Sequence, residues 1–118
     1  MKTLVIGASL KPARYSNMAI QRLVSKGHEV EAFGLRTGIV SGITINTEPI
    51  LFENIHTITL YMNPKRQEPF YDYFISIKPS RVIFNPGTEN PELFAILKAN
   101  NIEIEVACTL VLLSINQY

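Results

Sequence analysis

The feature that most constrains the fold is a short apolar strand that ends in a glycine and leads through a loop into a helix. The letters TLVI at residues 3–6 precede Gly7, a pattern typical of a central strand in a parallel sheet. Apolar residues then recur at helical spacing over residues 16–26, with Ser16 as the expected N-cap and Gly27 as the stop. Residues 28–33 alternate charged and apolar side chains, as a second strand would. The start of the chain therefore predicts a βαβ unit with a right-handed crossover.

The same alternation continues to the end of the chain. Pro69 is expected to break or restart the helix that follows Asn63 and Pro64. Further strands are predicted at residues 43–45, 57–62, 81–84 and 102–106, and further helices at 63–78, 90–98 and 109–115. Strands that alternate with helices predict an α/β fold, a Rossmann-like doubly wound three-layer α/β/α sandwich with a mostly parallel sheet of five or six strands. We expect one domain over residues 1–118.

Composition narrows the class of protein. Apolar residues make up 47% and charged residues 18% of the 118, which favours a compact fold over disorder. A formal charge of +1 gives no global attraction to nucleic acid or to an anionic membrane. Because the single Cys108 cannot form an internal disulfide, a reducing cytoplasm is the expected location. The apolar run of MKTLVIG is too short for a signal peptide, and no stretch is long enough to cross a bilayer.

Ligands of doubly wound sheets bind beyond the carboxyl ends of the strands, where the strand order reverses. That rule selects the loops at residues 7–16, 34–36, 62–65 and 85–89. The first loop lacks a dinucleotide fingerprint, because Ser9 and Pro12 replace its second and third glycines, and it lacks a P-loop. It does offer the hydroxyls of Ser9 and Ser16, the cations Lys11 and Arg14, and a helix N-terminus, all suited to phosphate. An ordinary strand-to-helix connection with solvated charges is the alternative.

The second loop bears on the type of nucleotide. An NAD site needs an acid at the end of the second strand, whereas this strand is followed by Leu35 and Arg36. An arginine there suits an additional ribose phosphate, at the 2′ position in NADP or the 3′ position in coenzyme A. The alternative is that Arg36 is a solvated loop charge.

Several strings in the sequence, taken together, resemble one family. They are VIGASLKPARYS, GHEVEAFG with the region around Gly42, and NPGTENPELFAILKANNIEIEV followed by Cys108. In this order and spacing the chain is similar to the stand-alone bacterial CoA-binding domain proteins, relatives of the nucleotide-binding domain in the alpha subunit of succinyl-CoA synthetase. The resemblance spans nearly the whole chain and implies coenzyme A or an acyl-CoA as the ligand.

The resemblance also implies a role for each loop. The CoA phosphates would be surrounded by Gly7, Ala8, Ser9, Arg14 and Ser16. The adenine and 3′-phosphate end would be lined by Gly34, Leu35 and Arg36, while Met62 and Asn63 would pack on the adenine or on the start of the pantetheine arm. The pantetheine path would be bordered by Asn85, Pro86 and Gly87.

The sequence shows no catalytic constellation. His28 and His56 precede strands, so both are expected at the end of the sheet opposite the ligand loops. Cys108 is expected to be buried and inert, with a mixed disulfide to the CoA thiol as the alternative. The histidines and the cysteine are too far apart in the sequence for a usual metal site.

Three functions remain open at this stage. The first is a non-catalytic or regulatory module that binds a small nucleotide ligand, CoA or acyl-CoA, without nucleic acid or membrane partners. The second is an NADP-type enzyme. The third is an interaction protein with a vestigial nucleotide site, because the family's Val-Asn-Pro is Phe33-Gly34-Leu35 here and its Asp-Arg before the cysteine is Val106-Ala107. A small domain with apolar aromatic side chains also favours a homodimer.

Overall fold

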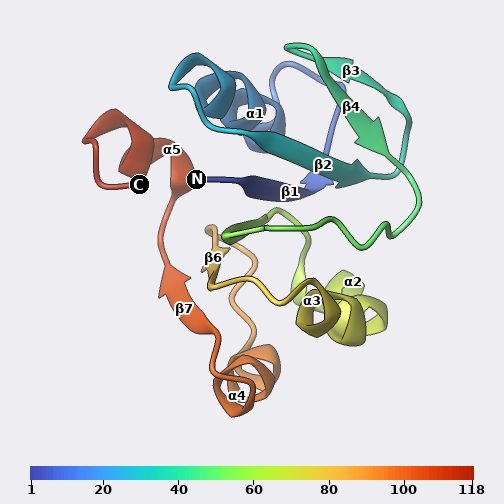
Figure 1. Cartoon of the computed structure of the whole chain (residues 1–118), viewed down its shortest axis with the longest axis vertical. Helices are drawn as coiled ribbons and strands as arrows, with labels where there is room; N and C mark the ends of the chain where they lie inside the picture. Colours follow the sequence, from blue (N-terminus) through green and yellow to red (C-terminus); the bar gives the residue numbers. More distant parts are fainter.

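In the computed structural model, which describes residues 1–118, a seven-stranded sheet runs through the middle of the molecule with helices on both faces (Figure 1). The elements follow in the order β1 (Thr3–Ala8), α1 (Tyr15–Ser25), β2 (Val30–Gly34), β3 (Gly38–Val40), β4 (Ile43–Asn46), β5 (Thr57–Leu60), α2 (Pro64–Gln67), the 3₁₀ turn η1 (Glu68–Phe70), α3 (Tyr71–Ile77), β6 (Arg81–Phe84), α4 (Pro91–Ala99), β7 (Glu103–Val106) and α5 (Thr109–Ser114).

The sheet has the strand order β3-β4-β2-β1-β5-β6-β7. All neighbouring pairs are parallel except β3 and β4, which form an antiparallel hairpin. From β1 the chain first builds outward through β2 and then returns to add β5 on the other side of β1. The order therefore reverses between β1 and β5, and the predicted doubly wound α/β fold is confirmed.

The sheet has one strand beyond the six predicted ranges. β3 pairs with β4 through a turn at Ser41 and Gly42, whose φ angles of 50° and 82° suit a two-residue hairpin. Because β3 is only three residues long and begins with a glycine, its sequence carries no clear strand pattern. The hairpin extends the sheet next to β2, on the side where the first loop lies.

Alternate residues of the strands supply two cores, one on each face of the sheet. Leu4 and Ile6 of β1 belong to the larger core, which includes Phe74 of α3 and Leu93 of α4. Val5, between them, faces the other core beneath α1 and α5. Figure 1 shows this layering, with α1 and α5 on one side of the sheet and α2, α3 and α4 on the other.

The predicted helix over residues 63–78 is divided into α2, η1 and α3, as Pro69 led us to expect. Proline has no N–H to donate to the preceding turn, so the chain tightens into η1 before Tyr71 restarts the helix. Lys78 ends α3 in the left-handed conformation with a φ of 55°. None of the helices combines the length and apolar character that crossing a membrane requires.

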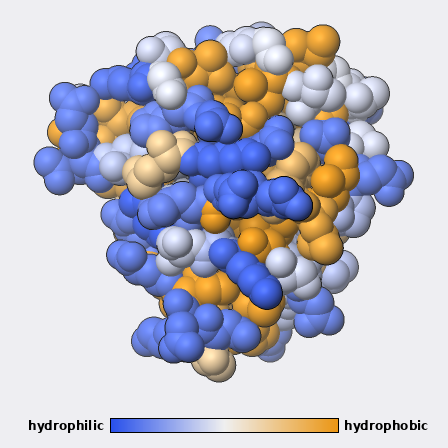
Figure 2. All heavy atoms as spheres, viewed as in Figure 1, coloured by the Kyte–Doolittle hydropathy of each residue, from blue (hydrophilic) through white to orange (hydrophobic).

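The surface seen in Figure 2 combines hydrophilic and apolar side chains. Hydrophilic side chains form a band across the middle of this face, and apolar side chains lie in separate patches around it. No single apolar area dominates this view.

Candidate functional site

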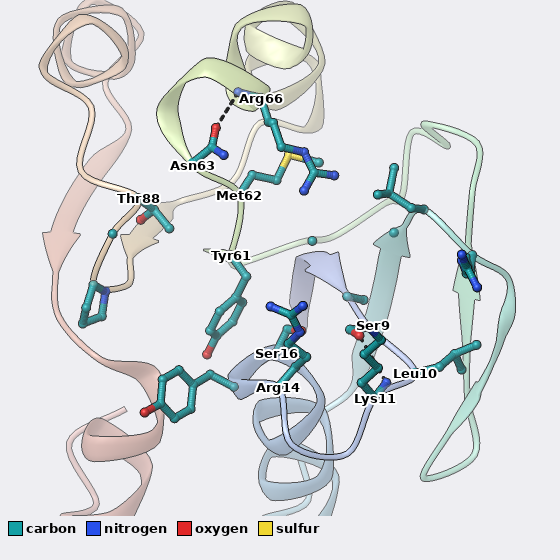
Figure 3. Close-up of a pocket in the computed structure, with 18 residues that line it drawn as sticks. Ser9, Leu10, Lys11, Arg14, Ser16, Tyr61, Met62, Asn63, Arg66 and Thr88 are labelled. Atoms are coloured by element: carbon teal, nitrogen blue, oxygen red, sulfur yellow. Dashed lines mark hydrogen bonds between the residues drawn. The ribbon is translucent and has the colours of Figure 1, made fainter.

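The loops after β1, β2, β5 and β6 meet in one cavity of about 650 Å³ at the point where the strand order reverses (Figure 3). Such a volume is within the range of small-molecule sites. Every predicted site residue except Asn85 lines this cavity: Gly7, Ala8, Ser9, Arg14, Ser16, Gly34, Leu35, Arg36, Met62, Asn63, Pro86 and Gly87. The structure thus brings together four loops that are far apart in the sequence, while the ligand contacts themselves stay a prediction.

Five further lining residues had no individual role predicted, although three of them, Leu10, Tyr15 and Thr88, lie in the selected loops; the other two are Tyr61 and Arg66. Tyr61 directly precedes the selected Met62, and Arg66 lies about one helical turn beyond Asn63. Spacing on a helix could have indicated Arg66, and Thr88 lies within the selected loop at residues 85–89.

Gly7 allows β1 and β5 to end side by side at the cavity. Its φ is 88°, and a Cβ atom there would lie 2.9 Å from the backbone carbon of Tyr61. The pairing of β1 with β2 shifts register between Ile6 and Ala8, so the strand bends as it leaves the sheet. A larger residue at position 7 would therefore push the first loop away from Tyr61.

Hydrogen bonds within the first loop fix its path to α1. The Ser9 hydroxyl accepts from the backbone N–H of Lys11 at 3.1 Å, and the Asn17 amide donates to the Ser9 carbonyl at 2.9 Å. Because Asn17 is buried on α1, it ties the loop to the start of that helix. Beyond Gly7, polar contacts thus hold the loop in place.

The first turn of α1 faces the cavity without a side-chain cap. Arg14, not Ser16, is the N-cap residue, it makes no capping hydrogen bond, and the turn holds no acid. By contrast, Asn63 caps α2 and Asn90 caps α4. An uncapped N-terminus leaves backbone N–H donors and the positive end of the helix dipole available to an anion.

The charge of the cavity wall has one sign. It is lined by Lys11, Arg14, Arg36 and Arg66 and by no aspartate or glutamate. All of these cations are exposed. The two ion pairs of the molecule, Lys2 with Glu31 and Arg81 with Glu105, use none of them. Cations gathered without counter-charges suit a ligand with several negative charges.

A second cavity of about 360 Å³ opens next to the first and is mostly apolar. It shares Gly34, Leu35, Met62 and Arg66 with the larger cavity and adds Phe33, Thr47, Pro49, Pro69 and Phe70. Aromatic and proline side chains offer flat apolar surfaces, which suit a planar base. A charged cavity that continues into an apolar one matches a nucleotide whose phosphates and base differ in polarity.

Asn85 lies beneath the cavity floor instead of at its surface. The side chain is 2% exposed, and its amide group donates to the Thr59 hydroxyl at 2.7 Å and to the Leu60 carbonyl at 2.9 Å. Its oxygen accepts from the backbone N–H of Thr109 at 2.9 Å. Asn85 therefore joins β5, β6 and the start of α5, and its position indicates a structural role.

Gln67 is the centre of a second buried network, between the loops after β5 and β6. It is fully buried, and its amide group donates to the Met62 carbonyl at 2.8 Å and to the Thr88 carbonyl at 2.9 Å. The Asn90 amide donates to the Gln67 oxygen at 2.9 Å. This buried network holds the loops after β5 and β6 at a fixed separation.

Tyr61 has an unusual hydroxyl, which is buried without a hydrogen-bond partner. The hydroxyls of Thr59 and Thr109 are its polar neighbours, but they bond to each other at 2.8 Å. Burial raises the pKa of Tyr61 to about 12, so the phenol is protonated at neutral pH. It is not a base under those conditions.

The histidines and the cysteine do not line either cavity. His28 and His56 precede β2 and β5, so they lie at the opposite end of the parallel strands, as predicted. Cys108 is partly exposed and not buried as expected, because it stands at the N-cap of α5, where the chain leaves β7. No cluster of three potential metal-ligating His, Cys, Asp or Glu side chains occurs in the molecule.

The model of the CoA binding domain family matches residues 1–114. This chain belongs to the CoA binding domain family. The match includes all four loops of the cavity, so the family's domain and the site described above coincide. Among curated proteins, none was found to match the chain.

Several solved structures share this fold over most of their length. One, described as an uncharacterized protein, is 49% identical with a TM-score of 0.96 and covers 99% of this chain and 97% of its own. A Thermus thermophilus protein, 20% identical, has a TM-score of 0.86 over 99% of this chain and 90% of its own. A conserved hypothetical protein from Pyrococcus furiosus, 25% identical, has a TM-score of 0.77 over 88% of this chain and 90% of its own.

Proposed function

We propose that this CoA binding domain protein binds coenzyme A or an acyl-CoA through its phosphate-bearing nucleotide end and does so as a non-catalytic or regulatory module. The observation that carries the proposal is the charge of the cavity, whose wall combines Lys11, Arg14, Arg36 and Arg66 with no acid. Coenzyme A has three phosphate groups, so its nucleotide end is a polyanion that such a wall would attract.

In this binding mode, each part of the ligand would contact residues of matching polarity. The diphosphate would lie on Ser9, Arg14 and the uncapped first turn of α1. The base would enter the apolar cavity, and the additional ribose phosphate would lie near Arg36. The pantetheine arm would pass Pro86 and Gly87. The charge and polarity of these residues thus fit CoA, from its anionic phosphates to its apolar base.

The titratable side chains of the cavity support binding without chemistry. They are Lys11, Arg14, Arg36, Arg66 and the two tyrosines Tyr15 and Tyr61. Among them, burial raises the pKa of Tyr61 to about 12, which keeps its phenol neutral at neutral pH. A regulatory module would therefore report CoA or acyl-CoA through binding alone.

The first test is thermal unfolding with CoA, dephospho-CoA, NADP or NAD, each at the same concentration. A ligand at about a hundred times its Kd stabilises the folded state by roughly 2.7 kcal/mol, which raises the Tm of a domain of this size by on the order of 10 °C. The proposal requires a shift with CoA and none with NAD. A shift with NADP alone would instead support a nucleotide-dependent enzyme, and no shift with any ligand would support a vestigial site.

The second test substitutes the phosphate-binding arginine. Arg14→Ala should weaken CoA binding by about ten- to a hundredfold, because a hydrogen bond to a charged group contributes roughly 1.5–3 kcal/mol. Arg22→Ala is the matched control, since Arg22 is an exposed arginine on the same helix that does not line the cavity. Equal affinity of both variants and the wild type in a calorimetric titration would refute the assignment. Incubation with acetyl-CoA, followed by chromatography, should show no turnover.

A further inference from the structure

Arg66 has a position that no other charged residue shares. It is the single charged side chain that lines both the large cavity and the apolar cavity beside it. Figure 3 shows Arg66 extending from α2 over the cavity next to Met62, across from Arg14 and Ser16 at the start of α1. Arg66 thus stands at the junction between the phosphate-binding and apolar parts of the site.

The fold fixes this orientation. The Asn63 side chain accepts from the backbone N–H of Arg66 at 3.0 Å, which caps α2 and sets its first turn. The next residue, Gln67, is fully buried and bonded to the loops on both sides. Because Gln67 anchors the inward face of α2, Arg66 is held on the face above the cavity, whereas Lys65 lines neither cavity.

The order of chemical groups in a nucleotide gives Arg66 a role. The ribose lies between the base and the diphosphate, so a base in the apolar cavity and a diphosphate at Arg14 place the ribose at the shared residues. Among these, Gly34, Leu35 and Met62 are neutral, and Arg66 alone can neutralise a phosphate. Arg36 lines the large cavity from the loop after β2.

We propose that Arg66 is a specificity-determining residue, which together with Arg36 binds the 3′-phosphate on the ribose of CoA and makes the site discriminate against nucleotides that lack it. This inference rests on the proposed function and adds a residue to it. A guanidinium presents two parallel N–H donors to a phosphate, and two such groups from different elements can hold a dianion from two sides.

The experiment measures the Kd of CoA and of dephospho-CoA by calorimetric titration, at one fixed ionic strength, for four proteins. They are the wild type, Arg66→Gln, Arg66→Lys and the control Lys65→Gln, an exposed cation on the same short helix. Arg66→Gln should weaken CoA binding by about ten- to a hundredfold and change dephospho-CoA binding less than about threefold. Arg66→Lys should recover part of the loss, because it keeps the charge without the planar fork. Lys65→Gln should match the wild type.

Other outcomes would overturn the inference. Equal losses for CoA and dephospho-CoA in Arg66→Gln would place Arg66 on the diphosphate or stacked on the base, and no loss for either would remove it from the site. Tm values of the free variants will show that folding is intact, which the exposure of Arg66 leads us to expect. Failure of the proposed function is distinguishable, because the wild type itself would then bind neither nucleotide.

Discussion

Gly34 is the position where a single methyl group should most clearly connect packing with ligand binding. It ends β2 and pairs with Ala8 at the end of β1. A Cβ atom at Gly34 would lie 2.3 Å from the Ala8 carbonyl oxygen and 3.1 Å from the Ile45 Cγ2. Ordinary contacts begin at 3.4 Å, so Gly34→Ala requires a shift of roughly 1 Å in the backbone that begins the first loop.

The size of the effect follows from that shift. Overpacking of a tightly packed region costs about 1–3 kcal/mol, and each kcal/mol lowers the Tm of a domain of this length by about 4 °C. Gly34→Ala should therefore lower the Tm by about 4–12 °C. Because the displaced carbonyl belongs to Ala8 in the cavity wall, the affinity for CoA should also fall, by about tenfold or more.

Gly38→Ala is the matched comparison. A Cβ at Gly38 would also be too close to its neighbour, at 2.4 Å, but the neighbour is the Cδ2 atom at the end of the Leu10 side chain. That side chain can rotate, whereas the Ala8 backbone cannot, so Gly38→Ala should cost less than half as much stability. Calorimetric melts and CoA titrations of both variants provide the test. Equal stability of Gly34→Ala and the wild type would refute the reasoning.

Two further predictions concern residues outside the cavity lining. Asn85→Ala removes the partners of the Leu60 carbonyl and the Thr109 N–H, so it should destabilise the protein by on the order of 2–4 kcal/mol in urea unfolding. The folded fraction should keep its CoA affinity. A tenfold weaker affinity at unchanged stability would make Asn85 a ligand residue. Burial, and secondarily the N-terminal ammonium, lower the pKa of His28 below 6.5. The unfolded chain therefore takes up this proton first, and stability should fall as the pH drops below about 6.5. His28→Gln should flatten that slope in melts between about pH 5 and 7, and parallel curves for both proteins would contradict it.

The sequence was informative where local patterns and the rules of parallel sheets act together. The strand before Gly7 and the helix after it can be recognised from hydrophobic spacing, and the rule for switch points then selects loops that line the cavity. Pro69 indicated the interruption between α2 and α3 because proline acts on its own backbone. For such residues, the local structure is determined by side chains only a few positions away in the sequence.

Other features depend on contacts that no local pattern records. Asn85 resembled a ligand residue because it begins a loop at the correct end of the sheet, yet its side chain turns down toward Thr59 and Leu60. Arg66 was not selected from the sequence, because only the anchoring of Gln67 shows which way α2 faces. The strand β3 exists because β4 provides a partner, and three residues alone cannot specify it.

In the proposed binding mode, a phosphate of the ligand would take the place of the missing N-cap of α1. A good N-cap contributes about 0.5–2 kcal/mol to a helix, and this chain leaves that contribution unfilled where Arg14 stands. An aspartate or serine at this position would cap α1 and stabilise the free protein. Its side chain would then compete with phosphate for the same N–H groups. In the binding mode proposed here, selection for ligand binding therefore acts against selection for a stable first turn of α1. The stability of that turn would depend on the cellular concentration of the nucleotide.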